Sequence, residues 1–188
     1  MIEVENITKS FDGTQVLKGI STVFEKGKTN LIIGQSGSGK TVFLKCLLGL
    51  FQADSGKILF EGKRLKKMNL KERTILRQEM GMVFQGSALF DSMTVEENIM
   101  FPMQMFTQKG DEEIRDRVNS VIKRVNLINA NDKLPDEISG GMKKRVAIAR
   151  AIVMNPKYLF CDEPNSGLDP KTAIIIDNLI KEITEEYN

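Results

Sequence analysis

The residues with the clearest chemical potential are eight consecutive ones, Gly34-Gln35-Ser36-Gly37-Ser38-Gly39-Lys40-Thr41. They fit the phosphate-binding pattern G-x-x-x-x-G-K-[ST]. Such glycines let successive backbone N–H groups point at the β- and γ-phosphates of a ligand at the start of a helix. Lys40 adds a point charge, and the hydroxyl of Thr41 is a ligand for Mg²⁺. The pattern predicts a phosphate-binding loop; the alternative is a glycine turn that only caps a helix.

Two adjacent carboxylates, Asp162 and Glu163, end the apolar run that starts at Tyr158. Phosphoryl transfer needs one carboxylate beside the magnesium and another where it can polarise an attacking water. Gln85 follows a second apolar run and can reach the metal or its water from a loop. Each feature alone is more often a strand end or a surface glutamine, so only the combination predicts a reaction centre.

A third group, Ser139-Gly140-Gly141, starts a helical pattern with a hydroxyl and two residues that lack side chains. Backbone N–H groups and the helix dipole there favour an anion. These groups are expected to face outward, with no phosphate of their own to bind. The arrangement predicts an anion site whose ligand arrives on another subunit; the alternative is an ordinary helix cap.

Apolar runs and alternating patterns predict the strands that position these residues. Leu31-Ile32-Ile33, directly before the phosphate-binding loop, is predicted as a buried strand, and Tyr158 to Asp162 as a fully buried one. The remaining predicted strands are 2–7, 19–24, 56–62 and 80–84. Several of them form an antiparallel layer around the loop.

Helices are predicted where apolar residues recur at helical spacing or where capping residues occur. Thr94-Val95-Glu96-Glu97 is a capping box, and Asp169-Pro170 places proline in the first turn of a last helix. The predicted helices are 39–50, one from Thr94, 111–125, 139–154 and 170–187.

Composition limits the class of protein. The chain has 188 residues, 41% hydrophobic and 28% charged, which suits one α/β domain with a sizeable core. A net charge of +2 gives no general attraction to nucleic acid, and neither a membrane span nor a signal peptide is evident, so a cytosolic protein is expected. The two cysteines, Cys46 and Cys161, are expected to be reduced core residues. The chain has no histidine.

In this order and spacing, the three groups resemble the nucleotide-binding subunit of ATP-binding-cassette (ABC) transporters, over essentially the whole chain. The resemblance implies an α/β P-loop NTPase fold of the ABC ATPase type, with a mostly parallel core sheet, an antiparallel β layer and a helical subdomain. Within the single domain 1–188, segments 1–85 and 156–188 are expected to form the nucleotide-binding core and 86–155 the helical subdomain.

The resemblance also implies roles for individual residues, with ATP and Mg²⁺ as cofactors. Glu163 is the catalytic glutamate, assisted by Gln85, and the metal ligands are Thr41, Gln85 and Asp162. Phe11 matches the aromatic residue that stacks on adenine, and Asp169 belongs to the D-loop. The full set of expected cofactor-binding residues is Phe11, Val16, Gly34, Ser36, Gly37, Ser38, Gly39, Lys40, Thr41, Val42, Ser139, Gly140, Gly141, Asp162 and Asp169.

Expected partners follow from the same resemblance. Two ATPase subunits meet head to tail, so that Ser139 and Gly141 of one cover the γ-phosphate held by Lys40 of the other. An integral membrane permease is the second partner, and nucleic acid is not expected. The subunit would lie on the cytoplasmic face of the inner membrane.

Two departures from the family pattern stand out. The fifth signature residue, usually glutamine, is Met142. The histidine that follows the Asp162-Glu163 strand in family members is missing, and Asn188 falls before its strand would begin. We therefore expect a truncated chain that lacks the strand between Leu31–Ile33 and Tyr158–Asp162. Residues 1–188 alone are expected to hydrolyse ATP negligibly; the alternative is a module that binds nucleotide without hydrolysis.

Residues 87–99, together with Ser139-Gly140-Gly141-Met142, resemble the ATPase of Mce-type phospholipid transporters. Met142 also occurs in glycine-betaine importer ATPases, so residues 86–90 carry most of this argument. A cluster of methionines and phenylalanines between Met93 and Phe106 suits a groove for a permease helix; core packing is the alternative. A non-transport ABC ATPase is disfavoured, because the chain has one cassette and no long coiled coil.

Overall fold

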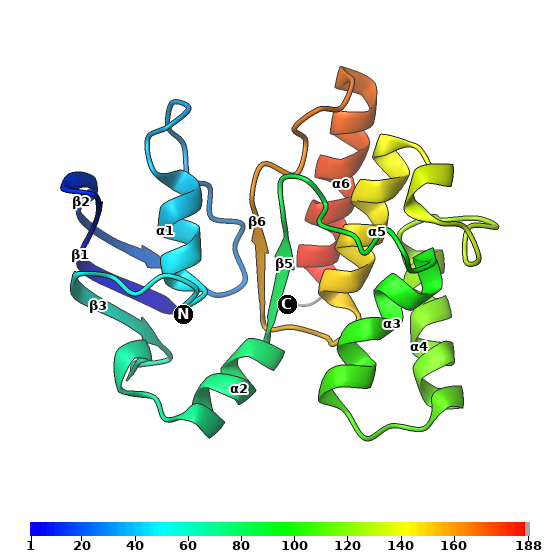
Figure 1. The fold of residues 1–188 in the computed structure, drawn as a ribbon, viewed down its shortest axis with the longest axis horizontal. Coiled ribbons are helices and arrows are strands. Elements are labelled where there is room, and N and C mark those ends of the chain that lie inside the picture. The colour runs from blue at the N-terminus through cyan, green and yellow to red at the C-terminus, as the bar shows by residue number, and fades with distance from the viewer. Residues whose placement is uncertain (187–188) are drawn as a thin grey trace. The chain divides into compact units, whose positions relative to one another are not determined.

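The computed structural model describes residues 1–186, which form two compact units, residues 1–77 and residues 78–186. Figure 1 shows the first unit in blue to blue-green and the second in green to red. Each unit has its own buried residues and is described by itself. The predicted division into 1–85 with 156–188 and 86–155 stays a prediction.

The first unit is built on an antiparallel sheet of four strands in the order β2-β1-β3-β4. These strands are β1 (Ile2–Phe11), β2 (Thr14–Phe24), β3 (Ser55–Phe60) and β4 (Lys63–Arg64). β1 and β2 form a hairpin with Phe11 opposite Thr14, and β1 also pairs with β3, Ile2 opposite Phe60. The predicted strands 2–7, 19–24 and 56–62 and the antiparallel layer are therefore confirmed.

Three helical segments complete the first unit: α1 (Lys40–Leu47), η1 (Leu65–Lys67) and α2 (Leu70–Gln78). α1 confirms the predicted helix but ends at Leu47, before the predicted end at residue 50; it buries Phe43, Leu44, Cys46 and Leu47. The sequence analysis missed α2, where Leu76 alone is buried. With so little apolar periodicity, the pattern on which helix prediction depends is weak there.

The predicted strand Leu31-Ile32-Ile33 is wrong. The segment has no strand conformation, and Leu31 and Ile33 are 79% and 86% exposed. A strand is defined by a hydrogen-bonded neighbour, and no described strand pairs with these residues. Apolar composition alone does not supply that neighbour.

The second unit contains two parallel strands, β5 (Met80–Val83) and β6 (Tyr158–Cys161). Met80 pairs with Tyr158 and Val83 with Cys161, so both strands end at the same edge. This parallel pair agrees with the mostly parallel core sheet that the resemblance implies. β6 is not fully buried, however, because only Phe160 is buried and the other three residues are partly exposed. Among the described strands only β5 pairs with it, so β6 is an edge strand of a two-stranded sheet.

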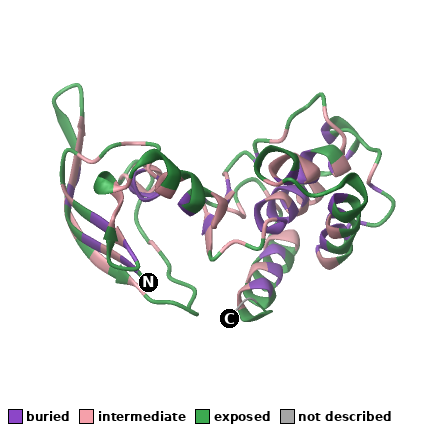
Figure 2. Cartoon of the chain, turned by 90° about the horizontal axis from the view of Figure 1, so that it is seen from below, coloured by how far each residue is buried: buried purple, intermediate pink, exposed green. Residues whose placement is uncertain are grey.

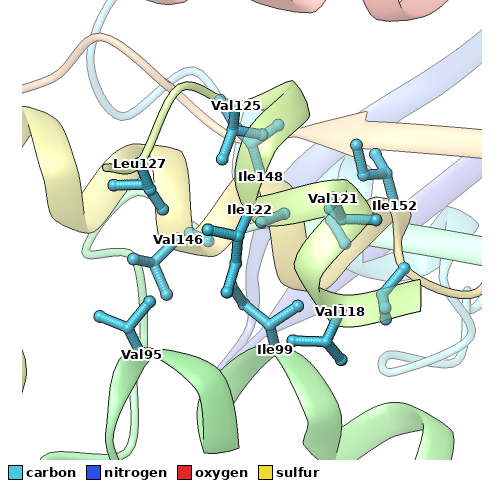
Figure 3. Packing of buried hydrophobic residues seen from close by; sticks show 14 of the residues in the cluster. Val95, Ile99, Val118, Val121, Ile122, Val125, Leu127, Val146, Ile148 and Ile152 are labelled. Carbon is cyan, nitrogen blue, oxygen red and sulfur yellow. The ribbon is translucent and has the colours of Figure 1, made fainter. Parts of the chain in front are cut away.

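The helices of the second unit pack around one hydrophobic cluster (Figure 3). They are α3 (Val95–Phe106), α4 (Asp111–Arg124), η2 (Pro135–Glu137), α5 (Gly140–Ile152) and α6 (Pro170–Glu186). Figure 3 places Val95 and Ile99 of α3 opposite Val118 and Ile122 of α4, with Ile148 of α5 beside them. Figure 2 shows the same helices as purple inner stripes with green outer faces. The cluster fixes α5 against the other helices.

Helix starts follow the sequence signals. Thr94 and Glu97 form the predicted capping box at α3, and the Ser139 hydroxyl caps α5 by accepting from the backbone N–H of Met142. α6 begins at Pro170 as predicted; Tyr187, placed in the same helix by sequence, lies outside the described residues. No described helix is both long and apolar enough to cross a membrane. Both cysteines are free thiols, as expected.

Candidate functional site

The predicted phosphate-binding loop lies in the first unit, directly before α1. Residues 35–38 form an exposed turn, closed by a hydrogen bond from Ser38 N to Gln35 O of 3.2 Å. Gly37 and Gly39 have φ values of +78° and +95°. These left-handed conformations strain residues with a Cβ atom, so the glycines are needed for this turn.

Gly39 also makes a close approach to the start of β2. A Cβ atom on Gly39 would lie 2.9 Å from Cγ1 of Val16 and 3.1 Å from Cδ2 of Leu17. The structure therefore brings Val16, predicted from the family resemblance, next to the phosphate loop. Contacts of Val16 and Val42 with a nucleotide stay predictions.

The ammonium of Lys40 folds back over the loop. Its Nζ atom donates to the carbonyl oxygens of Gly34 at 2.9 Å and Gln35 at 3.1 Å. The positive charge thus lies beside the exposed turn of Ser36, Gly37 and Ser38, where the motif predicts phosphate. Thr41 follows in the first turn of α1. Loop exposure, the required glycines and the lysine all fit a phosphate-bearing ligand.

Phe11 ends β1 in the same unit and is 38% exposed. Its ring meets Phe51 edge to face at 5.4 Å, and Nζ of Lys9 lies 5.2 Å from its centre. An accessible aromatic ring is compatible with adenine stacking. The stacking itself stays a prediction.

In the second unit, the structure brings Gln85 and Glu163 together beyond the parallel strands. Nε2 of Gln85 donates to Oε2 of Glu163 at 2.9 Å and approaches the Ser166 hydroxyl at 3.4 Å. Asp162 continues the ladder, since its N–H donates to Val83 O at 2.9 Å, and its side chain is 8% exposed. Glu163 turns the chain out of the ladder with a φ of +45°. A carboxylate can accept a proton from a water, and an amide beside it can orient a water that contacts both side chains.

The Ser139-Gly140-Gly141 group lies at the start of α5, with Gly140 exposed and the start of α6 close by. A Cβ atom on Gly141 would lie 2.8 Å from Cγ2 of Thr172, whereas one on Gly140 would have 3.9 Å to Leu168. Gly141 is therefore required for this packing. The carboxylate of Asp169 accepts from the N–H groups of Lys171 at 3.1 Å and Thr172 at 3.0 Å.

These hydrogen bonds give Asp169 a structural role. The hydrogen bond with Thr172 makes the largest contribution to lowering the pKa of the Asp169 carboxyl group. An acidic group at a helix start stabilises the helix when it is charged. The predicted contact of Asp169 with a cofactor stays a prediction.

Three polar residues of the second unit escaped the sequence analysis. Asn98 is fully buried and bonds Phe90 through both its N–H and C=O groups. Lys144 and Arg150 of α5 bond the carbonyl oxygens of Gln85, Ser87 and Ala88. The sequence does contain a signal for Lys144: it lies four residues before Ile148, on the apolar side of the predicted helix.

The donor chemistry also fits Mg²⁺ delivered with a nucleotide. Residues 1–186 hold no group of three or more His, Cys, Asp or Glu side chains that could bind a metal alone. Magnesium sites commonly use one or two protein carboxylates together with phosphate oxygens and water. Thr41 lies in the first unit, and Gln85 and Asp162 lie in the second. That the three share one ion stays a prediction.

The family described as "ABC transporter" matches residues 17–166 of the chain. The chain belongs to this family. A dimeric structure of the ATP-binding cassette MJ0796 bound to ADP and Pi superposes with a TM-score of 0.89 at 30% identity, covering 99% of this chain and 84% of that one. The cbiO1 protein of Clostridium perfringens, part of the ABC transporter complex cbiONQ, gives 0.88 at 35% identity, with 99% and 74% covered. The expected ABC ATPase fold class is confirmed.

Two curated relatives match the chain along its whole length. The "probable ribonucleotide transport ATP-binding protein mkl" of Mycobacterium leprae is 40% identical over 187 residues, 100% of this chain and 54% of mkl. The "methionine import ATP-binding protein MetN" of Clostridium tetani is 42% identical over 186 residues, 99% of this chain and 58% of MetN. The chain thus spans about half the length of these relatives.

Proposed function

We propose that this chain is the ATP-binding and ATP-hydrolysing part of a membrane ABC transporter. Family membership supports ATP binding, and the loop with Lys40 supplies the phosphate contacts. The observation that carries hydrolysis is the 2.9 Å bond between Gln85 and Glu163 at the ends of neighbouring parallel strands. The bond brings a carboxylate that can accept a proton next to an amide, and a water that contacts both of them would be oriented for attack.

In the proposed reaction, each group has a limited task. Lys40 and the N–H groups of the loop bind and orient the phosphates. Glu163 accepts the proton of the attacking water, and Gln85 orients that water. Bound Mg²⁺ supplies charge neutralisation between the phosphates, with Thr41, Gln85 and Asp162 as its proposed ligands.

The functional assembly that we propose is a head-to-tail dimer on a permease. Ser139 and Gly141 of one subunit would cover the γ-phosphate bound by Lys40 of the other. MJ0796, a cassette of the same fold, has been solved as a dimer, which supports this arrangement. The proposed location is the cytoplasmic face of the inner membrane, and nucleic acid is not a proposed partner.

The proposed cargo is phospholipid. Its support is the resemblance of residues 86–90 and Met142 to the ATPase of Mce-type phospholipid transporters. The second candidate is a small polar solute. The names of mkl and MetN, ribonucleotide transport and methionine import, favour this candidate, and glycine betaine belongs to the same class.

The test is stimulation of ATP hydrolysis by cargo. The whole gene product, reconstituted with its permease, is assayed with phospholipid, methionine, ribonucleotides or glycine betaine. Stimulation by phospholipid alone is expected. Stimulation by a small solute alone would replace the phospholipid assignment and leave the ATPase assignment intact.

Glu163→Gln separates binding from hydrolysis in the same assay. Glutamine keeps the shape but cannot accept a proton, so turnover should fall while ATP stays bound. Turnover of Glu163→Gln at the unmodified rate would remove Glu163 from the proposed role. Absence of any ATP hydrolysis in the unmodified complex would overturn the ATPase assignment itself.

A further inference from the structure

Two cations of α5 hold the backbone of the loop that follows β5. Nζ of Lys144 donates to the carbonyl oxygen of Gln85. Two guanidinium nitrogens of Arg150 donate to the carbonyl oxygens of Ser87 and Ala88, each at 2.8 Å. The loop is therefore attached at several points to the helix that starts at Ser139.

The loop backbone needs such support. Ser87 and Ala88 both have positive φ values, +62° and +49°, a region that residues with a Cβ atom seldom adopt. Arg150 also lies over the ring of Phe90, 5.9 Å from its centre. Strained backbone persists only where surrounding contacts determine it, and here the contacts come from α5.

Lys144 differs from an ordinary surface lysine. It is only 4% exposed, on the side of α5 that also buries Ala147, Ile148 and Ala151 in the hydrophobic cluster. Desolvation by burial lowers the pKa of Lys144. Within residues 1–186, no Asp or Glu carboxylate forms an ion pair with it. Buried lysines normally have a charged partner, so the Gln85 carbonyl is the contact that accounts for this one.

The side chain of Gln85 contacts the proposed catalytic carboxylate, Glu163. Its backbone carbonyl is held by Lys144, and its side-chain amide donates to Glu163 at 2.9 Å. A continuous series of contacts therefore leads from the helix of Ser139, through Lys144 and Gln85, to the carboxylate of Glu163. All of its members lie in the second unit.

We propose that Lys144 is a positioning residue for ATP hydrolysis. By fixing the main chain of Gln85, it keeps the Gln85 amide on Glu163 and ties that carboxylate to the helix that begins at Ser139. Movement of this helix is then transmitted to the water-activating pair. The inference rests on the proposed ATPase function, because only hydrolysis gives the position of Glu163 a consequence.

The test compares two lysine-to-methionine exchanges in the whole gene product with its permease. Lys144→Met keeps an unbranched stem in the core but removes the donor to Gln85. Lys123→Met makes the same exchange at an exposed residue of α4 whose side chain forms no hydrogen bond or ion pair within residues 1–186. A misplaced catalytic group costs about ten- to a hundredfold, so kcat of Lys144→Met should fall by that factor. Its KM for ATP should stay within about twofold, because the phosphate loop is untouched.

Rescue and stability distinguish positioning from simple packing. Lys144→Arg restores a cationic donor and should recover most of kcat, whereas Lys123→Met should match the unmodified protein. If Lys144→Met keeps kcat within about twofold, the inference is wrong. It is equally wrong if Lys144→Arg fails to recover activity while both variants melt at the unmodified temperature.

Hydrogen exchange tests the same contacts without turnover. Lys144→Met should speed amide exchange in residues 85–90 and 163–166 and leave the interior of α5, residues 146–152, unchanged. General loosening that includes 146–152 would indicate a packing role and overturn the inference. If neither the unmodified complex nor Lys123→Met hydrolyses ATP, the proposed ATPase function is wrong. The positioning role is tested separately: it is rejected if Lys144→Met leaves amide exchange in residues 163–166 unchanged.

Discussion

At the scale of single residues, Lys40 exchanges one set of acceptors for another when phosphate binds. Its ammonium donates to the carbonyl oxygens of Gly34 and Gln35. Charged donors bind phosphate oxygens more strongly than neutral carbonyls. The contribution of Lys40 to the free energy of phosphate binding is therefore the difference between these two sets of contacts.

Lys40→Ala should weaken ATP binding about ten- to a hundredfold, the equivalent of about 1.5–3 kcal/mol for charge-assisted hydrogen bonds. Titration calorimetry with Mg-ATP measures the change. Lys26→Ala, which removes an exposed lysine from the turn after β2, is the control and should bind ATP normally. Unchanged affinity in Lys40→Ala would contradict the phosphate-loop assignment.

Residue-level predictions succeeded where chemistry depends on neighbours in sequence. The Thr94 capping box and the Ser139 cap were predicted from residue type and spacing alone, and the structure confirms both. Asn98, Lys144 and Arg150 were missed because their partners are backbone carbonyls at positions 85–94, up to 63 residues away. A backbone carbonyl has no signature in a sequence, so such contacts appear only once the chain is folded.

At the scale of elements, the packing of α5 on β5 depends on one glycine. A Cβ atom on Gly81 would lie 2.4 Å from the carbonyl oxygen of Ala151 and 3.1 Å from Cγ of Pro156. Because a backbone oxygen and a proline ring cannot rotate away, the strand and the helix would have to separate. Both segments would then lose buried contacts.

Gly81→Ala should lower the free energy of unfolding by about 1–3 kcal/mol, the usual cost of overpacking. Denaturant titration followed by circular dichroism measures it. Gly86→Ala is the matched control, since nothing lies within 4 Å of its added Cβ atom. A loss in Gly86→Ala as large as that in Gly81→Ala would show that the packing explanation is wrong.

The cap of α6 makes a pH-dependent contribution to stability. Hydrogen bonds from Thr172 and then Lys171 lower the folded-state pKa of Asp169 below its ordinary value of 3.8. The unfolded chain therefore takes up this proton first as pH falls. The stabilisation is complete above the unfolded pKa and is lost as pH falls through the lowered folded pKa.

Asp169→Asn should reduce this acid-induced loss, because asparagine still caps helices but does not titrate. Unfolding of both proteins is compared at pH 7 and near pH 3, and their difference in stability should shrink at the lower pH. An undiminished difference would remove Asp169 from the acid response.

Helices and strands were predicted correctly where the signal lies within the segment itself. β1, α1, α4 and α5 follow from alternation, helical spacing or caps, and all are present. Leu31–Ile33 was predicted as a strand from apolarity alone, yet strand formation requires a partner that local sequence cannot specify. Burial of β6 also depends on neighbouring strands that its local sequence cannot specify, so β6 is less buried than its apolar sequence suggests.

At the scale of the whole molecule, the proposed site is shared between two copies of the chain. The exposed turn with Lys40 offers one set of anion donors, and the helix start with Ser139 offers a second set. Head-to-tail association would give each nucleotide both sets of donors. Nucleotide should therefore control association.

Glu163→Gln should form a dimer in Mg-ATP and return to monomer in Mg-ADP, because the γ-phosphate that joins the two surfaces is no longer hydrolysed. Light scattering after size-exclusion chromatography measures the mass of the ATPase subunit. Adding Lys40→Ala to Glu163→Gln provides the control and should abolish the ATP-dependent dimer. A mass that does not respond to ATP would contradict the proposed assembly.

The two thiols of the chain have a practical consequence. Desolvation raises the pKa of Cys161 to about 12 and also raises that of Cys46. At pH 8 a thiol with that pKa is ionised in only about one molecule in ten thousand, and alkylating reagents attack the thiolate. The folded protein should therefore react only slowly with maleimide dyes. A cysteine introduced at an exposed position such as Ser92 would carry the only bright fluorophore.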